Sequence, residues 1–299
     1  MTTREIITPN RGFRYLGDTE EEFKLAGQML EQQRRAGIKN KKPKTQNPDG
    51  NQGNPTTQLV LPDQDLQFVI KELYLEIRKY LERTFPNQNT ILNNFNWCVE
   101  KDSDGKATGR EYQTGSNPFV QIAIDMFLKS QPPDFRIARQ CDLETNLQMF
   151  KDFYIDSGLA LRSLEEPNKT QAENLYKQLR VRGLTDPQIF PMFFDLRGLE
   201  LSPNLEFKLT DESRYTKADC LNWQGGTKYS QTNEFGLPSS KNNSGSRKIW
   251  TRNSGLSGVF LNRISNLNSR NDDLANSSGY GRVVVVRPKG VQKNSGELK

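Results

Sequence analysis

The segment that most constrains the fold is the C-terminal stretch from residue 241 to residue 287. Asn, Ser, Asp, Gly and Arg surround a sparse set of apolar residues there, and the stretch closes with Val283–Val286, the most β-prone run in the chain. A disordered polar tail would lack both the apolar residues and the strand. The pattern therefore predicts an ordered, loop-rich surface that a buried strand holds in place, which is typical of a binding surface.

Composition narrows the classes of function. The chain has 299 residues, a length that favours one large or two medium domains. A net charge of +6 permits an anionic partner such as nucleic acid without requiring one. Histidine is absent, which removes the usual general base and the commonest zinc ligand. We therefore expect a protein that is not an enzyme and carries no metal and no cofactor.

Cysteine spacing and hydropathy bear on the compartment. Cys98, Cys141 and Cys220 are far apart and form no zinc-ribbon pair, which indicates free thiols in a reducing compartment. The N-terminus has no apolar signal core, and no run approaches the ~18 apolar residues of a membrane helix. The sequence predicts a cytoplasmic protein that does not contact a membrane.

The N-terminal part divides into two predicted segments. Residues 1–38 form a helical arm, because Asp18 can cap a helix that continues with acidic residues. Residues 39–58 are rich in Pro and Gly and predict a flexible basic linker. A cluster of six cations could contact phosphates without reading sequence, although a solvated linker is the other interpretation. Its members are Arg34, Arg35, Lys39, Lys41, Lys42 and Lys44.

Residues 59–194 predict a mainly helical domain. An apolar stripe at helical spacing covers residues 63–84 and indicates a core-facing helix, with self-association as the alternative. Asn117-Pro118 begins another helix, and residues 142–165 and 170–182 also show helical patterns. A short hairpin is possible between Asn87 and Gly115. The stripe consists of Leu66, Ile70, Leu73, Ile77 and Leu81.

The pattern changes after about residue 188. Residues 189–201 and 205–213 predict short strands around a turn at Ser202–Asn204. We place a boundary near residue 195, followed by a compact α+β domain over residues 195–290 and a tail over 291–299.

This last segment resembles a known family. Trp250 opens the Asn/Ser/Arg-rich stretch, and Gly281–Val286 closes it. The arrangement resembles the C-type-lectin-like variable proteins of diversity-generating retroelements, although RKIW stands where that family has GGSW. The resemblance implies an α+β fold class, in which a helical N-terminal domain precedes a small loop-rich C-type-lectin-like domain.

The same resemblance implies a non-enzymatic ligand-binding or display protein. Variable polar side chains would contact a protein or another macromolecular ligand, while the tryptophans add rigid contact area. Trp250, Leu261, Leu267 and Leu274 would belong to the fixed scaffold. The implied ligand-binding residues are Arg252, Asn253, Asn262, Arg263, Asn266, Asn268, Asn271, Asp272, Asn276 and Tyr280, with Ser265, Ser269 and Ser277 as further variable positions.

Two other functions remain open at this point. LKSQPPDF at 128–135 and MFKDFY at 149–154 resemble coat proteins of flexuous filamentous plant viruses, which implies an RNA-binding coat or nucleocapsid protein. Asp195, Glu206 and Lys208 match the loose spacing of Mg²⁺-dependent nucleases, in which carboxylates hold the metal and a Lys polarises water. The acidic pair Asp272-Asp273 could supply oxygens to Ca²⁺, but the spacing of a calcium loop is missing.

Overall fold

A computed structural model describes residues 64–131 and 135–288, which all belong to one compact unit. The predicted arm at 1–38, the linker at 39–58, the cluster of six cations from Arg34 to Lys44, and the tail at 291–299 lie outside the described residues.

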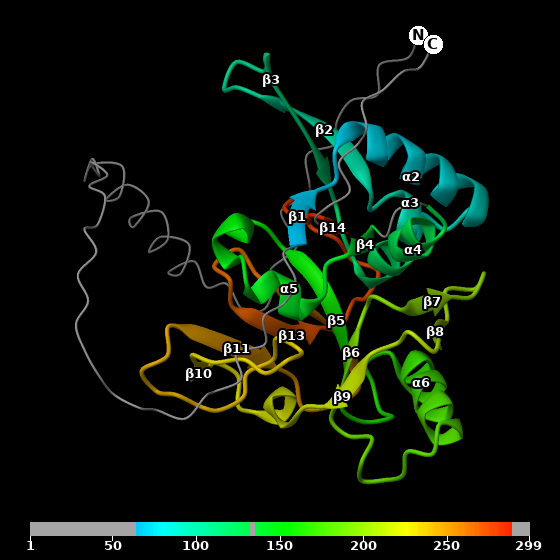
Figure 1. Ribbon diagram of the computed structural model, residues 1–299, viewed down its shortest axis with the longest axis vertical. Coiled ribbons are helices and arrows are strands. Elements are labelled where there is room, and N and C mark those ends of the chain that lie inside the picture. Colours follow the sequence, from blue (N-terminus) through cyan, green and yellow to red (C-terminus); the bar gives the residue numbers. More distant parts are fainter. Residues whose placement is uncertain (1–63, 132–134, 289–299) are drawn as a thin grey trace. The chain divides into compact units, whose positions relative to one another are not determined.

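A mixed seven-stranded sheet is the centre of this unit (Figure 1). All neighbouring strands are antiparallel except β11 and β13, which are parallel. The strand order across the sheet is β10 (Thr227–Tyr229), β11 (Arg247–Thr251), β13 (Leu267–Asn271), β12 (Leu256–Leu261), β5 (Ile155–Leu161), β6 (Met192–Asp195) and β9 (Tyr215–Lys217).

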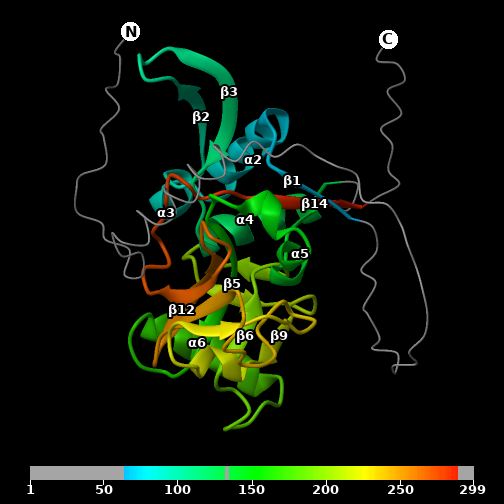
Figure 2. The same cartoon turned by 90° about the vertical axis from the view of Figure 1, so that its left-hand side faces the viewer.

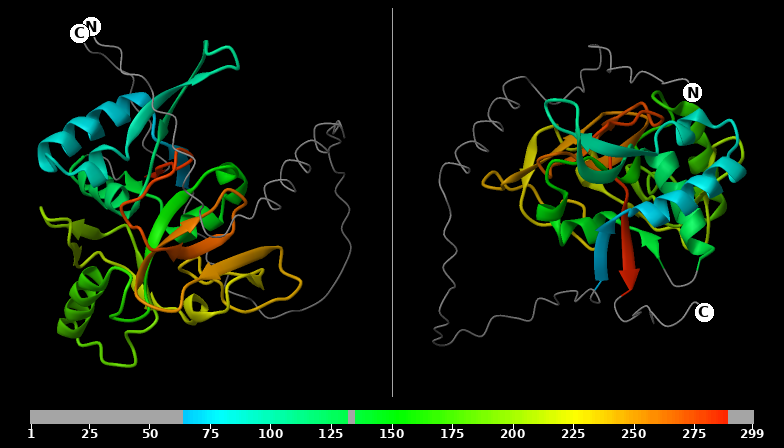
Figure 3. Two further views of the ribbon diagram at one scale, coloured as in Figure 1. Left: turned by 180° about the vertical axis from the view of Figure 1, so that it is seen from behind. Right: turned by 90° about the horizontal axis from the view of Figure 1, so that it is seen from above.

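A smaller sheet joins the two ends of the described chain. Strand β14 (Val284–Pro288) lies between β1 (Gln64–Phe68) and β4 (Arg136–Ile137), and both pairings are antiparallel. Two ribbons complete the strands: β2 (Asn96–Lys101) with β3 (Ala107–Thr114), and β7 (Leu199–Leu201) with β8 (Phe207–Leu209). The β2–β3 hairpin projects beyond the neighbouring elements in two further views (Figures 2 and 3).

Helices cover both faces of the large sheet. Alternate residues of β5 point to opposite faces, so that Leu159 and Leu161 join one apolar cluster and Ala160 joins the other. The first cluster contains residues of α2, α4 and α6, and the second contains residues of α5 and of the 3-10 helices. The helical segments are α2 (Lys71–Thr84), α3 (Asn89–Leu92), α4 (Pro118–Lys129), α5 (Gln140–Glu144), α6 (Lys169–Val181), η1 (Leu147–Phe150) and η2 (Asp219–Asn222).

The predicted fold class is wrong. The described residues are rich in strands, and among them no helical domain precedes a separate C-type-lectin-like domain. Strand β5 lies between β12 and β6, so that segments from both sides of residue 195 share one sheet. Pairing between strands that are far apart in the sequence leaves no local signal, because each strand on its own appears only as a short apolar run.

The helix predicted over residues 142–165 illustrates the error. The structure has α5, then η1, and then the strand β5. Every residue of β5 is buried, and a strand that is buried on both faces loses the alternation that identifies it. Residues 149–154, which include Phe150, Phe153 and Tyr154, therefore lead from η1 into a strand.

Other predicted elements are confirmed. The Asn117 side chain accepts a hydrogen bond from the Val120 N–H at 2.9 Å and begins α4, as expected of a capping residue. Helix α6, the β2–β3 hairpin, the turn between β7 and β8 and the C-terminal strand are present. The three cysteines are free. Within residues 64–131 and 135–288, no helix has both the length and the apolar character to span a bilayer.

The helix predicted over residues 63–84 is correct only in part. Leu66 belongs to β1, where it pairs with Val286, and the helix begins at Lys71. Ile77 and Leu81 are fully buried in the chain's own core. The part of the stripe that is helical is thus already used for packing within the unit.

Candidate functional site

The most distinctive surface of the described chain lies on one side of strands β10, β11 and β13. Ile249 and Thr251 are buried, whereas the alternate residues Lys248 and Trp250 are only half-buried. This alternation means that one side of β11 packs on the core and the other side reaches solvent. We call this surface the β11–β13 face. It comprises Lys228, Lys248, Trp250, Arg252, Asn268 and Arg270.

Trp250 lies at the centre of the β11–β13 face. Asn268 is its register partner on β13. The Arg270 guanidinium carbon is 4.7 Å from the centre of the ring, and the Lys248 amino nitrogen is 5.8 Å from it. A Cβ atom on Gly226 would be 3.5 Å from the ring, so the ring lies along this loop backbone. An aromatic ring with two cations over it is a cation–π arrangement.

The face carries an excess of positive charge. Lys228 and Lys248 are directly opposite each other in the antiparallel register of β10 and β11. Like charges in this position are destabilising, and neither lysine has a carboxylate partner among the residues that the structure describes. Arg252 is paired, because it contacts Asp272 at 2.7 Å. Lys228 and Lys248 thus have no carboxylate partner on the face, and Arg270 adds a third positive charge over Trp250.

A buried arginine supports the face from below. Arg162, which directly follows β5, donates to the Leu221 carbonyl at 2.8 Å, to the Ser257 Oγ at 2.8 Å and to the Ser269 Oγ at 2.6 Å. The side chain is 5% exposed, and burial lowers the pKa of the guanidinium to about 10. Through these bonds Arg162 ties β5, β12, β13 and η2 together, which fixes the strand that carries Asn268 and Arg270.

Some of the ligand-binding residues predicted from the sequence lie on this face or at its end. Arg252 and Asn268 belong to the face, and Asp272 pairs with Arg252. Asn271 is the last residue of β13 and is half-buried, whereas Asn253 follows β11 and is exposed. The side chains of Asp272 and Asp273 are both engaged in protein contacts, since the Asp273 carboxylate accepts from the Ala275 N–H at 3.1 Å.

Two other predicted residues are structural. Asn262 and Asn266 are buried. The Asn262 side-chain oxygen accepts from the N–H groups of Ile264 and Asn266, and the Asn266 side-chain oxygen accepts from the Lys248 N–H at 2.8 Å. These amides hold the β12–β13 turn against β11 and so help to keep the strands of the β11–β13 face in place.

The remaining predicted residues form a second location. The Arg263 guanidinium carbon is 4.1 Å from the centre of the Tyr280 ring, and Tyr280 is 50% exposed. The Asn276 side chain accepts from the Ser277 N–H. The loop that carries Asn276 is anchored by Asn94 and Asn117, which both donate to the Ala275 carbonyl. The predicted set is therefore divided between the β11–β13 face, a buried turn and this loop.

Sequence reasoning did not select Lys228, Lys248 and Arg270 for the site. The alternation of Lys248, Trp250 and Arg252 with buried residues was a usable local signal for β11. Lys228 comes from another strand, and only the pairing of β10 with β11 brings it to the face.

The residues of the nuclease pattern lie in different environments. Asp195 is fully buried, and its ion-pair partners are Arg139 at 3.9 Å and Arg214 at 4.0 Å. Glu206 and Lys208 are exposed, at and next to β8. No group of three or more His, Cys, Asp or Glu side chains that could hold a metal occurs within residues 64–131 and 135–288.

Asp195 makes stability depend on pH. Burial raises the pKa of its carboxyl from 3.8 to about 7, although Arg139 and Arg214 oppose this effect. Between these two pH values the folded state binds a proton that the unfolded state has released, so the free energy of unfolding falls as pH rises. We expect this fall between pH 5 and pH 7, by up to about 1.4 kcal/mol per pH unit.

Urea denaturation at pH 5, 6, 7 and 8 checks this expectation. Asp195→Asn should be more stable than wild type at pH 8 and should lose this advantage towards pH 5. Asp211→Asn, at an exposed position, is the matched control. Parallel curves for wild type and Asp195→Asn would rule out the expected linkage.

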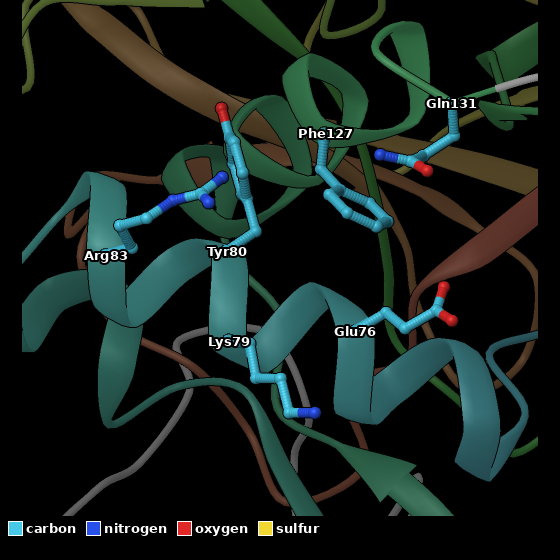
Figure 4. A pocket seen from close by; sticks show the side chains of 6 residues that line it. All are labelled: Glu76, Lys79, Tyr80, Arg83, Phe127 and Gln131. Carbon is cyan, nitrogen blue, oxygen red and sulfur yellow. The ribbon is translucent and has the colours of Figure 1, made fainter.

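A hollow of about 260 Å³ lies between α2 and the end of α4 (Figure 4). Glu76, Lys79, Tyr80 and Arg83 line it from α2, and Phe127 and Gln131 line it from the other side. The amino group of Lys79 points away from the Phe127 ring in Figure 4. The polar groups thus do not converge on one point, as they do in most small-molecule sites.

Comparisons of the chain with protein-family models, with curated proteins and with solved structures gave no match.

Proposed function

We propose that this chain is a non-enzymatic, cytoplasmic binding protein whose β11–β13 face contacts a macromolecular ligand. The observation that carries the proposal is the composition of this face. A half-buried tryptophan is surrounded by cations and an amide on the open side of a sheet whose other side is core. Trp and Arg are the residue types that contribute most to binding energy at protein surfaces.

The rigidity of the strands supports the same proposal. Trp250 and Asn268 sit on paired strands, and Arg162 holds β13 from the buried side. A surface that is ordered before binding loses less conformational entropy when the ligand arrives. Short amides and long cations around the ring supply adaptable hydrogen bonds, as in other evolved binding surfaces.

A panning experiment tests this function. A random-peptide library displayed on phage is panned on the full-length protein, and the affinities of selected peptides are measured for wild type and Trp250→Ala. We expect Trp250→Ala to weaken binding at least about tenfold, which is about 1.4 kcal/mol. Arg180→Ala, at an exposed position on α6, should bind as wild type does. Selected peptides that bind wild type and Trp250→Ala equally well would place binding elsewhere and contradict the proposal.

The relation to diversity-generating retroelements is a further part of the proposal. It rests on the polar positions between Trp250 and Gly281, and it has a genomic test. We expect a near-copy of the DNA that encodes residues 250–287, differing mainly at adenines, beside a reverse-transcriptase gene. A source genome without such a copy would remove this part of the proposal and leave the binding face unaffected.

A further inference from the structure

We infer that the β11–β13 face takes a single-stranded nucleic acid, an inference that rests on the proposed function and specifies its ligand. The first step is charge. Lys228 and Lys248 face each other without a carboxylate partner in the described part of the chain, and Arg270 adds a third cation. A phosphate group placed between the two lysines offsets their repulsion. The backbone phosphates of nucleic acids provide such groups at regular intervals, and cations that neutralise them release condensed counterions.

The second step is the order of side chains along the strand. Lys248 and Trp250 lie on the same side of β11, so their Cα atoms are about 6.6 Å apart. Arg252 is the next alternate residue, directly after the end of the strand. Cation, ring and cation thus form a row. Each repeat of an extended nucleotide strand carries one phosphate and one flat base. The cations of the row can contact the phosphates, and the Trp250 ring can contact a base.

The third step is the chemistry of Trp250 and its neighbours. Bases of single strands stack on aromatic rings and on arginine guanidinium planes, and a sheet face with exposed aromatics is an arrangement that single-strand binders use. Trp250 and Arg270 supply one group of each kind, 4.7 Å apart. Asn268, the register partner of Trp250, places an amide next to the ring, and amides hydrogen-bond to base edges.

These features favour a single strand over the other polyanions. In a duplex the faces of the bases are stacked on one another and are closed to Trp250, and the major groove admits a helix or a two-stranded ribbon rather than a wide sheet face. The carboxylates of an acidic peptide would neutralise the lysines, but such a peptide has no flat group at each charged repeat. It would therefore make no stacking contact with the Trp250 ring. The position of Trp250 between cations is therefore explained best by a ligand with alternating charge and base.

Fluorescence anisotropy tests the inference. A labelled oligothymidine of about 20 nucleotides is titrated with the full-length protein over a range of salt concentrations. We expect Trp250→Ala to weaken binding by about tenfold, within the range for the loss of one stacked base. The double variant Lys228→Ala/Lys248→Ala should also weaken binding, and it should lower the slope of log affinity against log salt by roughly 1.

Controls separate this face from other basic surfaces. Lys177→Ala, at an exposed position on α6, should match wild type. The inference is overturned if Trp250→Ala binds the oligonucleotide as wild type does, including the case in which only Lys41→Ala/Lys42→Ala reduces binding. The inference is also overturned if polyglutamate displaces the labelled oligonucleotide as well as unlabelled oligonucleotide does, and if the binding of polyglutamate is insensitive to Trp250→Ala.

The result can be told apart from a failure of the proposed function. If the selected peptides require Trp250 but oligonucleotide binding does not, the proposed binding face stands. Only the inference that its ligand is a nucleic acid then fails. If neither kind of probe depends on Trp250, the β11–β13 face is not the binding surface and both statements fail.

Discussion

Arg162→Leu is expected to lower the free energy of unfolding by about 1–3 kcal/mol, because it removes the donor of several buried hydrogen bonds to neutral groups. Arg162 is 5% exposed and bonds to β12, β13 and η2. Removing the guanidinium leaves the Leu221 carbonyl without this donor inside the protein, and an unsatisfied buried group costs about 1–3 kcal/mol. The Ser257 Oγ can still donate to the Ser269 carbonyl, which limits the loss.

Equilibrium denaturation in urea measures this effect. Arg180→Leu is the matched control, since Arg180 is exposed on α6, and it should stay within about 0.5 kcal/mol of wild type. Arg162→Lys should fall between wild type and Arg162→Leu, because one amino group can replace only part of the hydrogen bonds. An Arg162→Leu protein that is as stable as the Arg180→Leu control would show that the network does not hold the sheet together.

Gly158→Ala is expected to cost about 3 kcal/mol, the upper part of the range for overpacking a core. Gly158 is in β5, an interior strand of the seven-stranded sheet. A Cβ atom there would be 2.7 Å from the Cζ atom of Phe193 and 2.8 Å from the Phe194 carbonyl oxygen. Phe193 is itself fully buried, so the ring has little room to move.

A double-mutant cycle makes this prediction specific. Phe193→Leu alone should destabilise, since it leaves a cavity. In the double variant the smaller side chain at position 193 makes room for the new methyl group. The losses of unfolding free energy in the two single variants should therefore add up to about 1 kcal/mol more than the loss in the double variant. Gly279→Ala is the control, because a Cβ atom there meets nothing within 4 Å. Strictly additive costs would mean that Phe193 is not the obstacle.

The sequence predicted the elements that local chemistry specifies. Asn117-Pro118 was sufficient to locate the start of α4, because a capping side chain and a first-turn proline act on the next few residues. The Val-rich run at Val283–Val286 predicted a strand for a comparable reason, because β propensity depends on the residues of the run itself, and the structure has β14 there. The same run did not reveal that β1 and β4 are its partners.

The elements that failed are those that long-range pairing determines. Leu66 fits an apolar helical stripe, but pairing with Val286 places it in β1. Residues 155–161 show a helix-compatible apolar run, but β6 and β12 on either side make them a strand. The candidate site follows the same rule. Trp250 on β11 and Arg252 directly after it can be identified from the local sequence pattern, whereas Lys228 reaches the face only through the register of β10.

The antiparallel pairing of β1 with β14 has a consequence for how this chain acquires its structure. Phe68 pairs with Val284, so β1, near the start of the described residues, cannot pair until β14, near their end, is present. Contacts between such distant residues raise the contact order and slow folding, because the entropy of closing a long loop is lost before the contact forms. A growing chain on the ribosome must therefore carry β1 and β4 with unpaired edges until β14 has emerged. Open edges are the surfaces through which incomplete chains associate, so aggregation competes with folding until β14 has been synthesised and has paired.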